Sequence, residues 1–517
     1  MATRRGPSSG LVGWVGLVLA LVGCSHRVLT PNLHAPDAPP ESRSLSPVLK
    51  VHMKSGELYT LTNWRAAPDG SRVEGTGTRY SLARVPAETR SFSIPTDEVA
   101  LFETNTSENV HPGGAIVLTI WSTLTGAAAV YCLTNPKACF GSCPTFYLDG
   151  ADPDGRPAAE GFSASIARAL EARDVDAIGG GPAAGGRFGL TMRNEAFETH
   201  AVRRVRLLAA ERPPGGRVLA GPGGLFYPAS EPRAPLSCRA AEGDCLAAVR
   251  AADAAERASL ADAKDLATRE SVELDFAPGA GRLGLVLGAR QTLLSTHLFY
   301  QTMAYFGSRA GEYLASAERG GPATAARAMG MARVLGDIEV EVAEGAGGFR
   351  PIGSFDEAGP IAGDVRVLPF EASGGPLRVR LRQAKGHWRL DHAALVRLGE
   401  PVVPLALQPS TVERGSRPDA RALDLLRRGE RHLVSVPGDA YRIVFELPAS
   451  PGGLELFLES EGYYYEWMRR EWLAEENAEM ASLVLSDPAE ALRRMAGPFK
   501  RQEAGMERAF WASRFRK

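Results

Sequence analysis

Short runs that alternate apolar and charged residues are the feature that most constrains the fold of this chain. Residues 377–382 read Leu-Arg-Val-Arg-Leu-Arg, and residues 338–342 alternate apolar residues with glutamates. Neighbouring side chains of a β-strand point to opposite faces, so this alternation predicts sheets with one buried and one solvated face. Turn residues separate such runs at short intervals, which favours a sandwich or a jelly roll.

The composition is that of a folded protein with several domains. The chain has 517 residues, of which 44% are hydrophobic and 23% charged. This length is enough for about three or four domains of the usual size. The formal net charge of −1 gives no overall attraction to phosphate backbones, so no nucleic-acid partner is expected.

Changes of pattern along the chain predict eight successive segments. They are a leader over residues 1–23, a proline-rich tether over 24–48, a small β-barrel-like domain over 49–110, an apolar segment with a cysteine-rich loop over 111–150, a β-rich region over 151–235, a helical region with embedded strands over 236–330, a β-sandwich-like domain over 331–460 and a helical tail over 461–517. The predicted fold class is mainly β with helical insertions (α+β): a small N-terminal β-barrel, a larger β-sandwich or jelly-roll-like region and a helical C-terminal tail.

The first segment has the features of a secretory signal. Arg4 and Arg5 precede an apolar stretch over residues 11–22, which ends shortly before Cys24. Residues 21–24, Leu-Val-Gly-Cys, resemble the lipobox of bacterial lipoproteins. The resemblance implies cleavage before Cys24, attachment of diacylglycerol to its sulfur and acylation of the new amino group. The expected partner of Cys24 is therefore membrane lipid, and Ser25 in the next position favours the outer over the inner membrane of a cell envelope.

A second apolar stretch covers residues 115–133. No charged residue occurs between Pro112 and Pro136, so the stretch is long enough to cross a bilayer. It also contains serine, threonine and glycine near its middle, which is more typical of a buried helix or a pair of strands. Both interpretations stay open at this point.

Five cysteines remain when Cys24 is set aside for lipid. They are Cys132, Cys139, Cys143, Cys238 and Cys245. An oxidising envelope favours disulfides among them, and an odd number leaves one thiol over. Spacing does not decide the pairing, although the short loop between Cys238 and Cys245 makes that pair the easiest to close. No metal site is expected, because only Cys139 and Cys143 have a short, zinc-type spacing.

No motif defines a catalytic site or a cofactor site. Residues 279–284 have the spacing G-x-G-x-x-G, but strand-like residues follow them and the expected acidic residue is missing, so we interpret them as a turn and expect no nucleotide cofactor. His200, close to Glu195 and Glu198, and His297, in an apolar run, are interpreted as packed or surface histidines. Residues 463–467, Tyr-Tyr-Tyr-Glu-Trp, are interpreted as the junction of the terminal helix with a sheet.

These observations leave three functional hypotheses. The leading one is a lipid-anchored envelope protein that binds or scaffolds a protein or glycan partner. The first alternative is an envelope hydrolase acting on glycan or peptide, and the second is an assembly component that inserts residues 115–133 into a membrane. A deep polar pocket with clustered acids and histidines would favour the hydrolase, whereas an aromatic groove or an exposed apolar patch would favour binding.

Overall fold

The computed structural model describes residues 26–34, 39–40, 47–53, 57–80, 86–110, 143–151, 155–166, 168–179, 186–196, 198–310, 313, 329–356, 358–436, 438–466 and 475–512. The chain divides into two compact units, residues 1–129 and 130–517, and each is described by itself. Cys24, Cys132, Cys139 and the apolar stretch over residues 115–133 lie outside the described residues. The fold is mainly β with a helical C-terminal segment, which confirms the predicted fold class.

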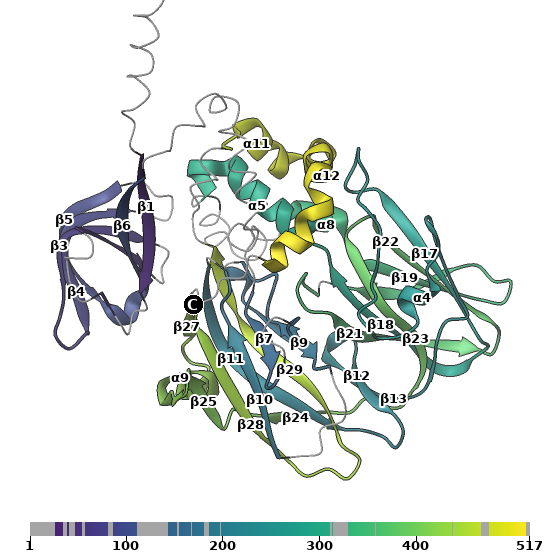
Figure 1. The fold of residues 1–517 in the computed structure, drawn as a ribbon. Helices are drawn as coiled ribbons and strands as arrows, with labels where there is room; N and C mark the ends of the chain where they lie inside the picture. Colours follow the sequence, from purple (N-terminus) through teal and green to yellow (C-terminus); the bar gives the residue numbers. More distant parts are fainter. Residues whose placement is uncertain are drawn as a thin grey trace, which may run out of the picture. The chain divides into compact units, whose positions relative to one another are not determined.

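The first unit is a curled antiparallel sheet around its own core (Figure 1). Its strands follow the order β1 (His26–His34), β6 (Val99–Val110), β2 (Val48–Met53), β3 (Leu58–Ala66), β4 (Arg72–Tyr80) and β5 (Pro86–Pro95), with the short 3₁₀ helix η1 (Thr96–Glu98) before β6. The core contains Leu49, Val51, Leu61, Trp64 and Phe102. Strand β1 comes from the segment that the sequence predicts as a tether, and it pairs with β6 along its whole length.

The first and the last of the described strands of the second unit belong to one β-sandwich. One of its sheets has the order β26 (Arg417–Pro418), β25 (Thr411–Arg414), β28 (Ala440–Leu447), β10 (Gly186–Arg193), β7 (Thr145–Leu148) and β8 (Ala159–Glu160). The other has the order β24 (Leu405–Leu407), β11 (Glu198–Glu211), β29 (Leu454–Glu466) and β9 (Ala172–Ala177), with β27 (Leu433–Ser435) also beside β11. Both sheets bury their inner faces in one shared core, to which Phe146, Leu190 and Leu458 belong.

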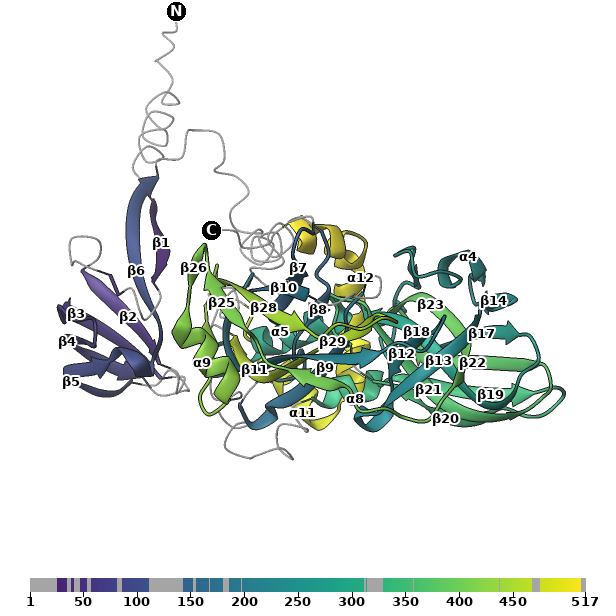
Figure 2. The ribbon, with the colours of Figure 1, turned by 90° about the horizontal axis from the view of Figure 1, so that it is seen from below.

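A second sandwich is inserted in the sequence between the early and the late strands of the first, and it lies beside the first (Figure 2). Its first sheet has the order β13 (Phe226–Arg233), β12 (Arg217–Ala220), β21 (Asp364–Ser373), β18 (Ala280–Gln291), β23 (Trp388–Leu398) and β16 (Arg257–Ala258). The second sheet has the order β15 (Gly243–Asp244), β14 (Ser237–Ala240), β17 (Arg269–Phe276), β22 (Leu377–Ala384), β19 (Ile338–Glu344) and β20 (Arg350–Phe355). Their shared core includes Val272, Leu285 and Val379.

Part of this second sandwich closes on itself. Strand β13 pairs with β23 as well as with β12, so that β13, β12, β21, β18 and β23 form a ring. Leu219, Tyr227, Val286, Val367 and Val396 are buried together as a separate small core of these strands. Closure removes two free strand edges and so satisfies backbone groups that would otherwise be exposed.

Four helices of the second unit pack on one another at one end of it (Figure 1). They are α5 (Leu294–Phe306), α8 (Gly330–Leu335), α11 (Ala478–Ser486) and α12 (Pro488–Ala512). The 3₁₀ helix η4 (Gly307–Arg309) directly follows α5. Two further helices, α4 (Leu246–Val249) and α9 (Ala420–Arg428), and the 3₁₀ helices η2 (Arg168–Leu170) and η3 (Pro222–Gly224) lie elsewhere in this unit. Among the described residues, none of the helices combines the length and the apolar composition that a membrane crossing requires.

Two local predictions are wrong. Residues 238–267, at the start of the predicted helical region, contain only one helical turn, α4, because Cys238 pairs with Leu274 of β17 and forms a disulfide with Cys245. Strand β29 continues to Glu466, whereas the sequence predicts a helical tail from residue 461. Aromatic residues favour strands, and β11 offers hydrogen-bonding partners along this length.

Candidate functional site

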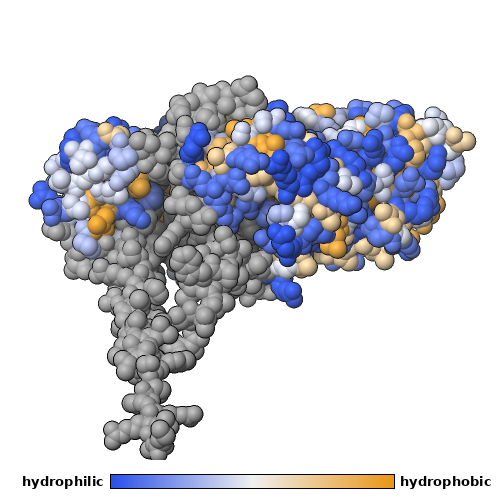
Figure 3. Space-filling model, turned by 90° about the horizontal axis from the view of Figure 1, so that it is seen from above, coloured by the Kyte–Doolittle hydropathy of each residue, from blue (hydrophilic) through white to orange (hydrophobic). Residues whose placement is uncertain are grey.

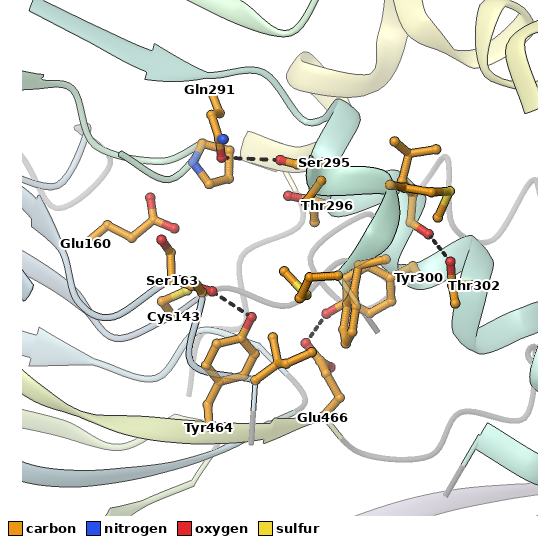
Figure 4. Close-up of a pocket in the computed structure, with 18 of the residues that line it drawn as sticks. Cys143, Glu160, Ser163, Gln291, Ser295, Thr296, Tyr300, Thr302, Tyr464 and Glu466 are labelled. Carbon is orange, nitrogen blue, oxygen red and sulfur yellow. Dashed lines mark hydrogen bonds between the residues drawn. The ribbon is translucent and has the colours of Figure 1, made fainter. Parts of the chain in front are cut away.

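A pocket of about 110 Å³ lies between α5 and one end of the first sandwich (Figure 4). Helix α5 supplies Ser295, Thr296, Leu298, Phe299, Tyr300 and Thr302 to its lining, and β29 supplies Tyr464 and Glu466. Cys143, Glu160, Ser163, Ala164 and Ile166 come from the segments around β7 and β8. The lining is completed by Gln291, Tyr313, Met329, Met331, Ala332 and Pro360, so the pocket is built from several parts of the chain that are far apart in the sequence.

The helical side of the pocket follows from the composition of α5. Apolar and aromatic residues occur all round this helix, which is typical of a helix buried on more than one side. The Thr292 hydroxyl accepts a hydrogen bond from the Leu294 N–H at 3.2 Å near its start, and Gly307, with φ of +51°, ends it. Helix α5 consequently packs against the other helices and still faces the sandwich.

The sheet side of the pocket is formed by the end of β29. Tyr464 and Glu466 are two residues apart in a strand, so both side chains leave the same face of the sheet. The Tyr464 hydroxyl donates to the Ser163 carbonyl at 3.0 Å, and the Tyr300 hydroxyl donates to the Glu466 carboxylate (Figure 4). These bonds join β29 to the loop after β8 and to α5.

Next to Tyr464, strand β11 carries a buried histidine and carboxylate. His200 lies opposite Tyr464 in the register of β11 and β29, and Glu198 lies opposite Glu466. The distance between His200 Nε2 and Glu198 Oε1 is 2.6 Å, and both side chains are completely buried. The histidine is packed, as its sequence context predicts.

The cysteines of the described residues have two different fates. Cys238 and Cys245 form a disulfide, while Cys143 is a buried thiol that lines the pocket. Burial raises the pKa of the Tyr464 phenol, and the nearby Cys143 and Glu198 raise it further. Tyr464 is therefore a neutral hydroxyl at physiological pH.

Glu160 connects the pocket to the second sandwich. Its side chain is buried, and its Oε2 accepts hydrogen bonds from the N–H groups of Ile361 and Ala362 at 2.7 and 3.3 Å. Gly359, with φ of +73°, approaches this carboxylate so closely that a Cβ there would lie 2.6 Å from it. A glycine is thus required for both the backbone conformation and the space.

A group of acids, of which Asp176 and Asp364 are buried, lies next to Glu160. Asp174 and Asp176 belong to β9, and Asp364 begins β21. Burial raises the pKa of Asp176 well above its ordinary value, and Asp174, Asp364 and Glu160 add to this effect, with Arg366 as the opposing cation. Asp364 accepts from the Ala177 N–H at 3.2 Å, so the acids also join sheets of both sandwiches.

Replacement of Asp176 by asparagine is expected to change the pH dependence of stability. Because its pKa is raised in the folded protein, the folded state keeps the proton to a higher pH than the unfolded chain, and stability falls as the pH rises through the folded pKa. The limiting slope is about 1.4 kcal/mol per pH unit for one proton. Urea unfolding at a series of pH values above the unfolded pKa of aspartate, about 4, should show stability falling with pH for the wild type and a smaller fall for Asp176→Asn.

The matched control for this prediction is Asp424→Asn. Asp424 lies on α9, has a 56% exposed side chain and pairs with Arg428. Its removal should leave the wild-type slope in place, since an exposed pair contributes little. An unchanged slope in Asp176→Asn would show that Asp176 ionises equally in both states.

His297, the other histidine considered in the sequence, does not line the pocket. His297 is buried in α5 beside the ring of Phe499, at 5.2 Å between centroids, and burial lowers its pKa to about 4. It is a neutral packed histidine, as predicted. Within the part of the chain that the structure describes, no three or more histidine, cysteine, aspartate or glutamate side chains are grouped so that they could hold a metal ion.

The exposed surface offers a weaker candidate than the pocket. On the face of the second unit drawn in Figure 3, hydrophilic residues predominate and hydrophobic residues lie in small separate groups. The large apolar side chains exposed among the described residues are Leu225, Leu236, Leu260, Val402, Val403, Leu405 and Leu485. Only a small group forms around Val402, which bridges to Phe226 next to Leu225.

Some residues of the pocket belong to a distinctive string in the sequence, whereas others belong to no motif. Tyr464 and Glu466 belong to the aromatic string at residues 463–467, but their strand conformation sends Tyr464 into the pocket while Tyr463 contacts His432 elsewhere, at 5.1 Å between ring centroids. Glu160 and the residues of α5 stand in no motif. Successive side chains of a strand point to opposite faces, so a strand assignment for these residues would have placed Tyr463 and Tyr464 on different faces of the sheet.

Comparison with models of protein families and with curated protein sequences gives no match. Among solved structures, the chain is similar to a mutant of the arabinofuranosyltransferase AftD from Mycobacteria, with 10% identity and a TM-score of 0.16. The match covers 86% of this chain and 32% of that one, so the chain spans about a third of the length of the transferase. A similarity this low carries no argument about fold or activity.

Proposed function

We propose that this chain is a lipid-anchored protein of a bacterial cell envelope that binds a small ligand in the pocket between α5 and β29. The lipobox-like residues 21–24 support the anchor, with Cys24 as its attachment point and the outer membrane as its location. The observation that carries the binding function is the pocket itself, which combines an apolar lining with a few fixed polar groups.

Binding is favoured over hydrolysis by the way the polar groups are used. The Glu466 carboxylate accepts from Tyr300, the Tyr464 hydroxyl donates to Ser163, and Glu160 accepts from two backbone N–H groups. Groups held by such bonds define the shape and polarity of a site. Hydrolysis is the second candidate, because the pocket brings the Cys143 thiol near Tyr464, whose neighbour His200 is paired with Glu198.

Filling the pocket is expected to abolish ligand binding. Ser295 lies on α5 and lines the pocket, so Ser295→Phe places a ring in the space a ligand would occupy. Saturation-transfer NMR with butan-1-ol, on the full-length protein in detergent, should show binding to the wild type and at least about tenfold weaker binding to the variant. Ala332→Phe, on another side of the pocket, should act in the same way.

Leu485→Phe is the matched control for these variants. It also adds a ring, but on α11 at a side chain that is 49% exposed, and it should bind butan-1-ol like the wild type. Equal binding by all the variants would refute a ligand site in this pocket. Consumption of ester or peptide analogues that is lost in Cys143→Ala would favour the hydrolase instead.

A further inference from the structure

Polar side chains on several sides of the pocket form hydrogen bonds within the protein (Figure 4). On α5, the Thr302 hydroxyl donates to the carbonyl of Leu298 at 2.8 Å, and the Ser295 hydroxyl donates to Gln291 Oε1 at 3.4 Å. The other walls are joined in the same way, by bonds between Tyr300 and Glu466, between Tyr464 and Ser163, and between Glu160 and the N–H groups of Ile361 and Ala362. A ligand therefore meets polar groups that already have partners.

This arrangement is unfavourable for a ligand with many polar groups. A sugar or a peptide carries hydrogen-bonding groups on most of its sides, and each of them loses water when it is buried. Such a ligand would have to break bonds of the lining or leave some of its own groups unpaired, and both cost free energy. A hydrocarbon chain makes no such demand.

Two hydrophobic cores meet at the pocket. Ile166 and Cys143 belong to the core of the first sandwich, while Leu298 and Met331 belong to the core that the four packed helices share, and all of them line the pocket. The ring of Phe299, also part of the lining, packs against both cores. A hydrocarbon chain in this space would remove its own apolar surface from water and gain dispersion contacts with both cores.

The size of the pocket limits the length of this chain. The volume is about 110 Å³, and an apolar protein cavity of about 150 Å³ holds benzene. In proportion, the pocket holds about four carbon atoms. Met329 and Met331 lie against this space, and their unbranched side chains adapt readily to a linear ligand.

We infer that the ligand of this pocket is a straight hydrocarbon chain of about four carbon atoms, either as a short alkyl compound or as the end of a longer acyl chain. This inference rests on the proposed binding function and adds the chemical class of its ligand. The chain lies between α5 and the first sandwich, in contact with Phe299 and Ile166. Polar compounds of the same size bind more weakly, because their polar groups lose water without gaining partners.

A series of straight-chain alcohols tests the inference. Saturation-transfer NMR with the full-length protein in detergent should show an affinity that rises about fourfold for each added CH₂ group, from ethanol to butan-1-ol or pentan-1-ol, and then levels off. Propane-1,2-diol, which matches butan-1-ol in size but has a second hydroxyl group, should bind at least about tenfold more weakly. The same series with Ser295→Phe, whose pocket is filled, measures partition into the detergent and is subtracted.

The longest alcohols identify the source of the chain. If octan-1-ol binds as tightly as pentan-1-ol, the pocket holds the end of a longer chain that continues outside it. If octan-1-ol binds more weakly, the pocket encloses a short alkyl compound. Both outcomes support the inference.

Met331→Ala should lengthen the chain that the pocket accepts. The substitution removes the side chain beyond Cβ and opens space for about two or three further CH₂ groups, so the affinity should now rise as far as hexan-1-ol or heptan-1-ol. Met303→Ala is the matched control, because Met303 is buried in the same helical core but is not a residue of the pocket lining. Met329→Ala provides a second test if Met331→Ala fails to fold.

Three results would contradict these expectations. An affinity that does not change with chain length, or a diol that binds as tightly as butan-1-ol, would overturn the inference and leave the binding function intact. A limit that stays at the same chain length in Met331→Ala and Met329→Ala would overturn the placement of the chain in this pocket. A wild type that binds none of the alcohols would overturn the proposed function as well.

Discussion

Replacement of Arg290 by methionine is expected to lower the free energy of unfolding of the second unit by about 3–5 kcal/mol. Arg290 is 2% exposed, and its guanidinium donates to both carboxylate oxygens of Glu256, at 2.6 and 2.7 Å, and to Glu507 of α12. Burial opposes the charge, but the bonds to Glu256 and Glu507 prevail and raise the pKa of Arg290. Methionine would leave a buried carboxylate without its main partner.

The same side chain also supports the pocket. Arg290 Nη1 donates to the carbonyl of Pro360 at 2.8 Å, and Pro360 and the neighbouring Gln291 both line the pocket. The variant should therefore lose affinity for butan-1-ol as well as stability. Urea unfolding followed by fluorescence measures the first effect, and saturation-transfer NMR measures the second.

Arg282→Met is the matched control on the same strand, β18. Arg282 is 32% exposed and its partner Glu400 is 90% exposed, so this change should cost less than about 1 kcal/mol. A similar small loss for both variants would mean that the buried network around Arg290 contributes no more than a surface ion pair.

Replacement of Cys24 by alanine is expected to abolish lipid attachment completely. Each buried CH₂ group of an acyl chain contributes about 0.8 kcal/mol, and two or more chains hold a protein on a bilayer in an almost irreversible way. In a bacterial host, mass spectrometry of the wild type should show a chain that begins at a lipid-modified Cys24. The variant should incorporate no labelled fatty acid.

Cys143→Ala is the control for this prediction, since Cys143 is a buried thiol of the pocket and should not affect processing. Globomycin, which blocks lipoprotein processing, should cause the wild-type precursor to accumulate. A mature wild-type chain with an unmodified thiol at Cys24 would refute the anchor, while the proposal of a ligand pocket would remain.

Much of the fold could be predicted from local patterns. The alternation at residues 338–342 and 377–382 corresponds to β19 and β22, which are neighbours in one sheet and bury their apolar residues in the same core. The disulfide between Cys238 and Cys245 agrees with the easiest pairing. The predicted helical region over residues 236–330 is wrong at its start, residues 238–267, because alanine and charged residues favour helix locally, whereas pairing with β17 and the disulfide decide the structure.

The pocket could not be predicted in the same way. Cys143, Tyr300 and Tyr464 meet only because β29 pairs with β11, and because a whole second sandwich is inserted between the two halves of the first. No local pattern predicts such an insertion, because the pattern of apolar and polar residues in a strand does not depend on which strand it pairs with. The buried polar residues Glu160 and Asp176 gave no signal either, because their environment is set by β21 and its preceding loop.

The sequence by itself determined the strand-rich class, the solvated and buried faces of individual strands and the lipobox-like context of Cys24, since each depends on neighbouring residues alone. Only the tertiary structure decided which strands pair, which thiol is buried and that Glu466 meets Tyr300 of α5. The physical reason is that the direction of a side chain is a local property, whereas burial and charge at a site are sums over residues from the whole chain.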